Sequence, residues 1–261
     1  MKSPFTLGRI ALRGTWFLAA SFAGLLHAAW LALFERDVPP ATRRARWLRR
    51  WGSELIRIAG VQVEVRGHPP DGGLLVANHV SYLDVAALAS ATEMVFVSKA
   101  EVRHWPLIGQ LARAGGTLFL QRERRADVAD LAPQFQPLVE EGVVLTLFPE
   151  GTSTGGDHVL PFHSALLAPA ARHGWPVTPA HVRYELPGGS VADEVAYWRD
   201  MTFLPHFLNL LGRRGVRVVV QFGEPQRDAD RKALARSLHA AVVALSQRST
   251  QVPAQAQQPA A

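Results

Sequence analysis

The hydrophobic and polar positions divide the chain into an apolar N-terminal run and a longer part in which short apolar runs recur. Residues 14–34 contain no Asp, Glu, Lys or Arg, and such a run is long enough to cross a bilayer as a helix. Trp16 and Trp30 lie near its two ends, where indole rings favour the membrane–water interface. Polar residues within the run weaken insertion, so the pattern predicts a segment that either spans the membrane or lies half-inserted. A secretory signal peptide is a third interpretation, because basic residues precede the run.

A basic cluster follows the apolar run and dominates the formal net charge of +6. Basic residues next to a membrane segment each contribute about 1 kcal/mol of attraction to anionic lipid. They also bias the following part of the chain towards the cytoplasm, so we expect a protein of the cytoplasmic membrane with its larger part on the cytoplasmic side. The motifs of nucleic-acid binding proteins are absent from the sequence, and a nucleic-acid partner is not predicted. The cluster consists of Arg36, Arg43, Arg44, Arg46, Arg49, Arg50 and Arg57.

Apolar residues share that basic stretch at helical spacing, among them Trp47, Trp51 and Ile58. This pattern favours an amphipathic helix on the membrane surface. A helix whose apolar face lies in a protein core has the same pattern and remains the alternative.

Beyond position 60, short apolar runs alternate with helical stretches. Strands are expected at 61–65, 72–77, 94–98, 117–121, 143–148, 177–182 and 216–222, and helices at about 80–89 and 128–141. This alternation predicts an α/β fold with a mostly parallel sheet flanked by helices, preceded by the N-terminal membrane-associated helical segment. Residues 201–211 are a further apolar stretch, expected in the core, with an acyl channel or a membrane contact as the alternative.

His79 and Asp84 lie where the strand at 72–77 gives way to a helix, the end of a strand at which catalytic groups concentrate. They can meet if His79 lies in the loop and Asp84 in the first helical turn. Asp84 would then accept from one imidazole nitrogen and leave the other free to take a proton from a hydroxyl. The alternative is structural: Ser81 and Asp84 also fit a capping box, in which Asp84 only closes the start of the helix.

Two other strand ends carry residues suited to chemistry. The strand at 143–148 ends in a turn rich in Gly, Ser and Thr at 149–156, whose backbone N–H groups can stabilise an oxyanion. The strand at 117–121 is followed by Arg122, which suits an anionic group. Arg124 and Arg125 are expected to be solvated.

Together these blocks resemble the glycerolipid acyltransferase family, of the 1-acyl-glycerol-3-phosphate type. Four motifs in the right order carry the resemblance, over about 61–225. They are His79 and Asp84 with Asn78 and Ser81; Gly116, Phe119 and Arg122; Phe148, Pro149, Glu150, Gly151 and Thr152; and Val177 to Ala180.

The resemblance implies direct O-acyl transfer from acyl carrier protein or coenzyme A to the free hydroxyl of a lysolipid. It assigns the general base to His79 and its orientation to Asp84, and it implies no cofactor or metal beyond the acyl thioester co-substrate. The substrate-binding residues it implies are Arg122, Glu150, Gly151, Thr152 and Gly116. The expected division is 1–60 as membrane anchor and basic amphipathic helix, 61–245 as catalytic domain, and 246–261 as a disordered tail.

Position 153 bears on the acceptor. Family members that form phosphatidic acid usually follow the third motif with arginine, whereas this chain has Ser153. The missing cation weakens the case for an acceptor that carries a phosphate. The expected acceptor is still 1-acyl-glycerol-3-phosphate, in phospholipid biosynthesis, and the alternative is lyso-ornithine lipid or another lysolipid.

Two other classes of function fit parts of the sequence. Gly151, Ser153 and Gly155 match the Gly-x-Ser-x-Gly pattern of a serine hydrolase, with Asp200 or Asp228 and His206 or His239 as possible partners. A membrane adaptor without catalysis would use the anchor and basic surface alone. The chain has no cysteine, which excludes disulfides and cysteine nucleophiles, and its histidines lack the spacing of a metal hydrolase.

Overall fold

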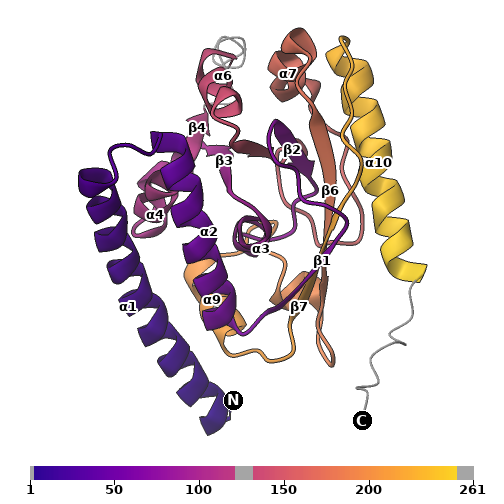
Figure 1. Cartoon of the computed structure of the whole chain (residues 1–261). Helices are drawn as coiled ribbons and strands as arrows, with labels where there is room; N and C mark the ends of the chain where they lie inside the picture. Colours follow the sequence, from indigo (N-terminus) through magenta and orange to yellow (C-terminus); the bar gives the residue numbers. More distant parts are fainter. Residues whose placement is uncertain (1–2, 121–131, 252–261) are drawn as a thin grey trace, which may run out of the picture.

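The computed structural model describes residues 3–120 and 132–251. Within these ranges seven strands form one sheet in the order β1-β7-β6-β2-β5-β3-β4 (Figure 1). All neighbouring pairs are parallel except β6 and β7. The predicted α/β fold with a mostly parallel sheet is therefore confirmed. The strands are β1 (Gln62–Arg66), β2 (Leu74–Ala77), β3 (Met94–Lys99), β4 (Leu118–Leu120), β5 (Val144–Leu147), β6 (Val177–Glu185) and β7 (Arg217–Phe222).

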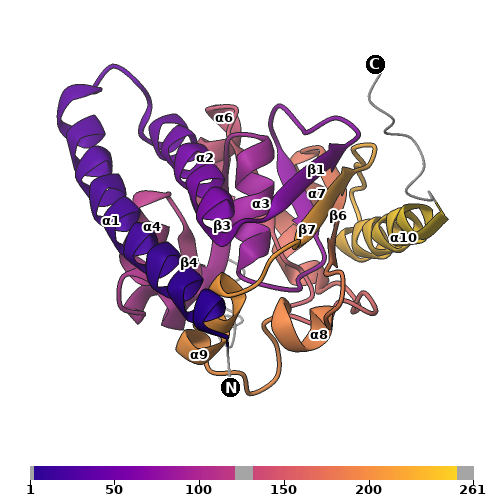
Figure 2. The same cartoon turned by 90° about the horizontal axis from the view of Figure 1, so that it is seen from below.

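Helices cover both faces of the sheet. The helical elements are α1 (Pro4–Phe34), α2 (Pro40–Ala59), α3 (Leu83–Ala91), η1 (Ala100–His104), α4 (Ile108–Ala114), α6 (Ala132–Glu140), η2 (Ser164–Leu167), α7 (Ala168–His173), α8 (Val191–Glu194), α9 (Phe203–Leu211) and α10 (Arg231–Gln251). Successive side chains of a strand point to opposite faces: Leu75 and Ala77 of β2 join the cluster of α1, α2, α3 and α9, whereas Leu74 and Val76 join that of α6, α7 and α10. Figure 2 shows these layers, with α1, α2 and α3 on one side and α10 on the other.

Helix α1 is longer than the apolar run from which it was predicted. It begins at Pro4 because the Ser3 hydroxyl accepts the backbone N–H of Thr6 as an N-cap and proline suits the first helical position. Its 31 residues make it long and apolar enough to cross a membrane, by length and composition. One side contacts the rest of the protein: Gly24 O accepts the indole N–H of Trp47 at 2.8 Å, and Phe17 packs against Phe207.

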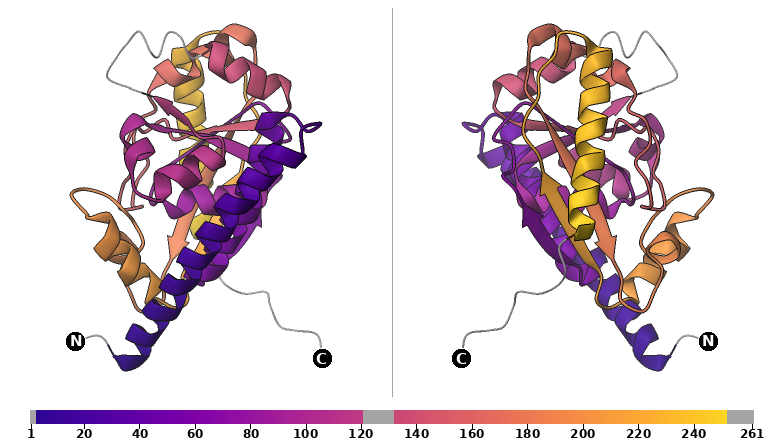
Figure 3. Two further views of the ribbon diagram at one scale, coloured as in Figure 1. Left: turned by 90° about the vertical axis from the view of Figure 1, so that its left-hand side faces the viewer. Right: turned by 90° about the vertical axis from the view of Figure 1, so that its right-hand side faces the viewer.

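The other side of α1 is exposed and strongly apolar. Leu18, Phe22 and Leu26, each one helical turn from the next, are 61%, 66% and 57% exposed. Figure 3 shows the helix running along the outside of the domain, with its N-terminal end projecting beyond it. Among the described residues, protein therefore covers one side of this helix and leaves the opposite, apolar side exposed.

Helix α2 corrects the expectation of a membrane-surface helix. Trp47 and Ile58 are buried, in the same cluster as Leu75 of β2 and Leu83 of α3. The apolar face that suggested a membrane is therefore part of the protein core, and α2 packs closely against α3. Gly60 ends the helix in the left-handed conformation (φ 67°) that glycine adopts without strain.

Two C-terminal segments also differ from expectation or sharpen it. Helix α10 continues to Gln251, so the first part of the expected tail at 246–261 is helical, and residues 252–261 lie outside the described ranges. Its buried face is formed by Leu234, Leu238 and Val242, which follow one another at about one helical turn. Helix α9 forms most of the apolar stretch at 201–211. Its buried face joins the core while Leu204 is 60% exposed.

Candidate active site

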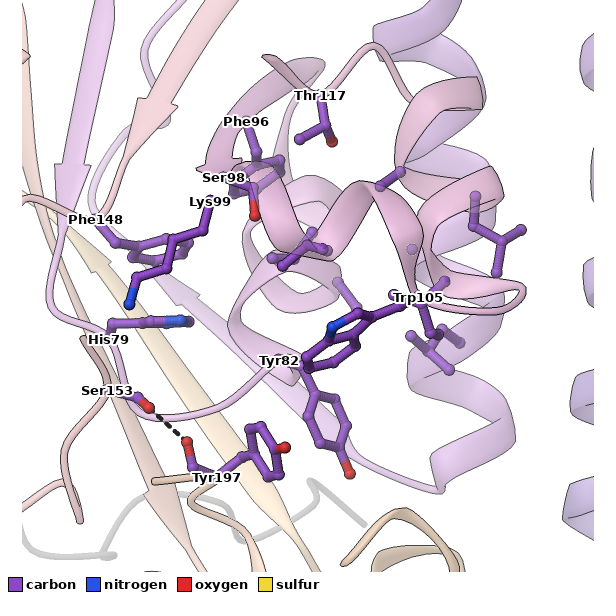
Figure 4. A pocket seen from close by; sticks show the side chains of 18 of the residues that line it. His79, Tyr82, Phe96, Ser98, Lys99, Trp105, Thr117, Phe148, Ser153 and Tyr197 are labelled. Carbon is purple, nitrogen blue, oxygen red and sulfur yellow. Dashed lines mark hydrogen bonds between the residues drawn. The ribbon is translucent and has the colours of Figure 1, made fainter. Parts of the chain in front are cut away.

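Chemically useful side chains meet where β2, β5 and β3 end. These neighbouring parallel strands finish at the same edge of the sheet. The loop after β2 carries His79, the turn after β5 carries Gly151 and Ser153, and β3 ends at Lys99. All four residues border one cavity (Figure 4).

His79 and Asp84 are in direct contact. His79 lies in the loop and Asp84 in the first turn of α3, and the distance from His79 Nδ1 to Asp84 Oδ2 is 2.8 Å. The same carboxylate oxygen accepts the backbone N–H groups of Val80 and Ser81, at 2.7 and 3.0 Å. Tyr184 of β6 donates its hydroxyl to the other oxygen, Oδ1, at 2.7 Å. Asp84 is completely buried, and these bonds stabilise the charge that burial would otherwise disfavour.

The capping alternative is partly right. Asp84 does bind the backbone amides that precede α3, as a helix cap would. The reciprocal bond of a capping box is missing, because the buried hydroxyl of Ser81 makes no hydrogen bond within the described chain. One carboxylate thus shapes the loop and binds His79.

Asn78 fixes the start of this loop. Its side-chain amide donates to Val182 O at 2.9 Å, and its carbonyl accepts Val182 N–H at 2.7 Å. Backbone pairing between β2 and β6 extends from Leu74 to Ala77. The side chain of Asn78 therefore continues the hydrogen bonding to β6 at the point where the backbone of β2 leaves the sheet before His79.

The imidazole of His79 is stacked on Phe148, with ring centroids 4.1 Å apart. Its Nδ1 is occupied by Asp84, and its Nε2 has no hydrogen-bond partner among the described residues. The side chain is 25% exposed. An oriented imidazole with one free nitrogen beside a cavity can accept a proton from a bound hydroxyl.

The cavity beside His79 has a volume of about 390 Å³. Its polar part contains His79, Ser98, Lys99, Thr152 and Ser153, and Figure 4 shows the Lys99 side chain reaching towards His79. Its other walls are apolar, from α1, α2, α3, η1, α4 and α9. Those walls include Phe17, Leu48, Trp51, Leu55, Val85 and Phe207.

The remaining residues expected at the site are distributed unevenly. Gly151 and Thr152 border the cavity. Gly116 does not; a Cβ at that position would meet Val95 and Arg44, and its φ of 77° suits glycine. Arg122 lies outside the described residues.

Glu150 faces inward, away from the cavity. Oε1 accepts the backbone N–H of His79 at 2.9 Å, and Oε2 accepts that of Leu160 at 3.0 Å. Burial raises the pKa of Glu150 to about 7, although both backbone hydrogen bonds act in the opposite direction. The Glu150 carboxylate therefore holds the backbone of His79. The sequence motif did not reveal this inward orientation of the side chain.

Ser153 is also tied to the backbone. Its hydroxyl donates to Tyr197 O at 2.5 Å, and Tyr197 N–H donates to Val80 O at 2.9 Å. These bonds draw the segment around Tyr197 over the loop of His79, and the Tyr197 ring becomes a wall of the cavity.

The serine hydrolase alternative is contradicted by this geometry. The chain from Phe148 to His163 forms no helix, so the strand–turn–helix context of a nucleophile elbow is missing. The candidate histidines have other partners: His206 Nδ1 contacts the Tyr82 hydroxyl at 3.0 Å, and His239 Nε2 lies 3.3 Å from Val159 O. Among the described residues, moreover, no group of three or more His, Asp or Glu side chains is arranged to hold a metal ion.

Comparisons with known proteins agree on one family. Residues 61–183 match the family described as Acyltransferase. A lyso-ornithine lipid O-acyltransferase of Rhodobacter capsulatus is 39% identical over 250 residues, covering 90% of this chain and 89% of that protein. One from Pseudomonas aeruginosa is 37% identical over 90% of this chain and 92% of its own length.

Two further proteins connect the chain to acyltransferases of another name. A 1-acyl-sn-glycerol-3-phosphate acyltransferase of Neisseria gonorrhoeae is 33% identical over 115 residues, which cover 44% of this chain and 45% of that protein. The crystal structure of a 1-acyl-sn-glycerophosphate acyltransferase from Thermotoga maritima has a TM-score of 0.70 and covers 96% of this chain and 100% of its own. At 19% identity, it shows a shared fold.

Proposed function

The chain belongs to the acyltransferase family, and we propose that it transfers a fatty acyl group from a thioester to the free hydroxyl of a lysolipid. The observation that carries this proposal is the 2.8 Å contact between His79 and Asp84 at the edge of an apolar cavity. A membrane adaptor without catalysis would not need a buried carboxylate that orients a histidine.

In the proposed reaction, His79 Nε2 takes the proton of the acceptor hydroxyl while the hydroxyl oxygen attacks the thioester carbonyl. Asp84 keeps the second proton on Nδ1 and stabilises the imidazolium that forms. The carbon–sulfur bond then breaks, an ester remains, and the proton passes from His79 to the leaving thiolate. A positioned base of this kind accelerates such reactions by about 10² to 10⁴.

The turn after β5 and Lys99 are suited to the charges of this reaction. Gly151 and Thr152 border the cavity, and the backbone N–H of Thr152 has no acceptor among the described residues. Such a donor stabilises the oxyanion of the tetrahedral intermediate. Lys99 supplies a positive charge beside His79 that suits a carboxylate or phosphate on the acceptor. The apolar walls suit the acyl chain, and the thioester is carried by acyl carrier protein or coenzyme A, without a further cofactor.

We propose a lyso-ornithine lipid as the acceptor in preference to 1-acyl-glycerol-3-phosphate. Relatives of that name match along nine-tenths of this chain. Ser153 adds a physical argument, because an arginine at this position would bring a second cation for a phosphate. Serine instead fastens Tyr197 beside the cavity. An ornithine head group carries a carboxylate and an amine but no phosphate, and thus needs fewer cations.

Association with a membrane fits the lipid substrate. The exposed side of α1 would lie in the lipid while its other side stays packed against α2 and α9. This arrangement favours a half-inserted helix over a free-standing span, and we place the enzyme on the cytoplasmic membrane, facing the cytoplasm.

The test is acyl transfer by the purified full chain in detergent. A radiolabelled acyl thioester, on acyl carrier protein or coenzyme A, is offered with lyso-ornithine lipid, with 1-acyl-glycerol-3-phosphate, or with neither. We expect labelled diacyl product with lyso-ornithine lipid at a kcat/KM at least about tenfold higher, which corresponds to 1.4 kcal/mol of discrimination. Preference for the phosphate acceptor would overturn the proposed acceptor, and transfer to neither would overturn the proposed reaction.

A further inference from the structure

Tyr184 of β6 contacts Asp84 of the proposed catalytic pair. It lies outside the four sequence motifs, the last of which ends at Ala180 on the same strand. Strand β6 is nine residues long, and only Val177–Ala180 pair with β2. Its second half therefore runs on beside the loop that carries His79. Side chains of a strand alternate between faces, so Ala180, Val182 and Tyr184 all point into the core beneath α3.

The position of the Tyr184 hydroxyl is fixed by the burial of its side chain and by the pairing of its backbone. The residue is buried, at 5% exposure, and its backbone pairs with Val218 of β7. Two residues earlier, the Asn78 amide holds Val182. The hydroxyl thus reaches Asp84 from a rigid strand, at 2.7 Å.

The two carboxylate oxygens of Asp84 have different hydrogen-bond partners. His79 and two backbone amides share Oδ2, and Tyr184 alone donates to Oδ1 among the described residues. A carboxylate held on one oxygen only can rotate about its terminal torsion, which has a broad preference. Donation to Oδ1 removes that freedom and leaves Oδ2 aimed at Nδ1 of His79.

We propose that Tyr184 is a positioning residue for acyl transfer, whose hydroxyl fixes the Asp84 carboxylate in the orientation that holds His79. This inference rests on the proposed roles of His79 and Asp84. Tyr184 does not border the cavity, so it acts through Asp84 and not by touching the substrate. Burial raises the pKa of Tyr184 well above its ordinary value, and the hydroxyl remains a donor throughout the assay range.

Other charged and titratable groups surround the pair. Glu150 binds the backbone of His79, Lys99 lies at the cavity beside it, and His181 of β6 is buried near Asp84. None of them donates to Oδ1, so a Tyr184 variant changes a contact that these groups do not replace.

The experiment compares Tyr184→Phe with Ser81→Ala as a matched control. Both changes delete one buried hydroxyl beside Asp84, but that of Ser81 makes no hydrogen bond within the described chain. We expect Tyr184→Phe to lower kcat about ten- to a hundredfold, the effect of losing a hydrogen bond to a charged group, with KM for both substrates unchanged. Ser81→Ala should keep the kcat of the wild type.

The pH profile separates positioning from a loss of folded protein. Without the Tyr184 hydroxyl, Asp84 keeps more unshared negative charge beside the imidazole, which favours the protonated form that cannot act as a base. The acidic limb of kcat/KM should therefore move to higher pH in Tyr184→Phe. Unchanged kcat and an unchanged limb would overturn the inference. A lower kcat with an unchanged limb and a lower thermal midpoint would also overturn it, since Tyr184 would then only stabilise the fold.

His79→Ala, measured in the same series, distinguishes this inference from the function on which it rests. If His79→Ala is inactive and Tyr184→Phe behaves as the wild type, only the role of Tyr184 is refuted. If His79→Ala is active, the catalytic pair itself is refuted, and the inference about Tyr184 falls with it.

Discussion

Glu150 accepts the backbone N–H of His79 at 2.9 Å through a carboxylate that is buried at 3% exposure. The resemblance assigned this glutamate to substrate binding, whereas its side chain points away from the cavity and joins the His79 loop to Leu160. Its contribution to the site, in this geometry, is to hold the backbone from which His79 projects.

The raised pKa of Glu150 predicts how the stability of the protein depends on pH. Burial raises the pKa from 4.5 to about 7. A carboxyl group whose pKa is higher in the folded state contributes stability that is complete below the unfolded value and is lost as pH rises through the folded value. The free energy of unfolding of the wild type, relative to Glu150→Gln, should therefore fall between pH 4.5 and 7 and then level off. Urea unfolding across pH 4.5–8 measures this difference; a constant difference over that range would refute the titration of Glu150.

Asp84→Asn should lower kcat by about 10² to 10⁴, the contribution of a positioned base. The Asn oxygen can take the place of Oδ2, where three donors meet, but a neutral amide does not stabilise the charge on the imidazolium that forms when His79 takes a proton. Steady-state kinetics with a circular dichroism spectrum checks the change. Activity above a tenth of the wild type, in a folded variant, would show that Asp84 serves the loop and not the reaction.

Ser153→Arg should shift the preference between acceptors towards 1-acyl-glycerol-3-phosphate. Arginine adds a cation at the cavity and removes the hydrogen bond that holds Tyr197. Competition between the two acceptors at equal concentration measures the ratio of kcat/KM, which we expect to change about tenfold or more, that is, by 1.4 kcal/mol.

Ser153→Ala is the control for the acceptor experiment. It removes the same hydrogen bond without adding charge, and most of the activity and the original preference should remain. An acceptor ratio that is the same in Ser153→Arg as in the wild type would show that position 153 does not select the head group. Loss of all activity in Ser153→Ala would contradict this account and would favour Ser153 as a nucleophile.

The exposed side of α1 should be required for membrane binding but not for folding. Replacing Leu18, Phe22 and Leu26 by Gln removes three large apolar side chains that the rest of the domain leaves uncovered. Sedimentation with vesicles of phosphatidylcholine and phosphatidylglycerol should leave most of the variant in the supernatant, and its thermal midpoint should stay near that of the wild type.

Val65→Thr on β1 serves as the matched control for vesicle binding. Val65 is a large apolar residue that is 42% exposed but is not on α1. This variant should bind vesicles as the wild type does. Equal binding of the α1 variant and the wild type would contradict the proposed lipid contact.

The sequence predicted the positions of the strands well because most are short apolar runs, and because β1 (Gln62–Arg66) alternates between polar and apolar residues. It did not distinguish the two environments of α2, since a helix on a membrane and a helix on a core carry the same stripe of apolar residues. Trp47, for example, is buried in a cluster with residues of α1, α3 and the sheet, and the sequence of a helix alone does not show what its apolar face packs against. Arg122, central to the resemblance, lies outside the described residues, and its assignment stays a prediction.

The contacts of the candidate site were only partly accessible from the sequence. The spacing that puts His79 in a loop and Asp84 in the first turn of the following helix was enough to predict that they could meet. Tyr184 lies 100 positions from Asp84, and its contact depends on β6 pairing with β2, an order of strands that local patterns do not specify. The inward direction of Glu150 depends on the path of the turn that follows β5, which the motif alone leaves open.

The most direct test of the account is single-turnover acyl transfer by His79→Ala. His68→Ala, at an exposed position in the loop after β1, is the matched control. With a labelled acyl thioester and lyso-ornithine lipid, we predict that the wild type and His68→Ala form the ester at equal rates, and that His79→Ala is slower by about 10² or more with an unchanged thermal midpoint. Ester formation by folded His79→Ala at the rate of the wild type would contradict the central claim that His79 is the base of this reaction.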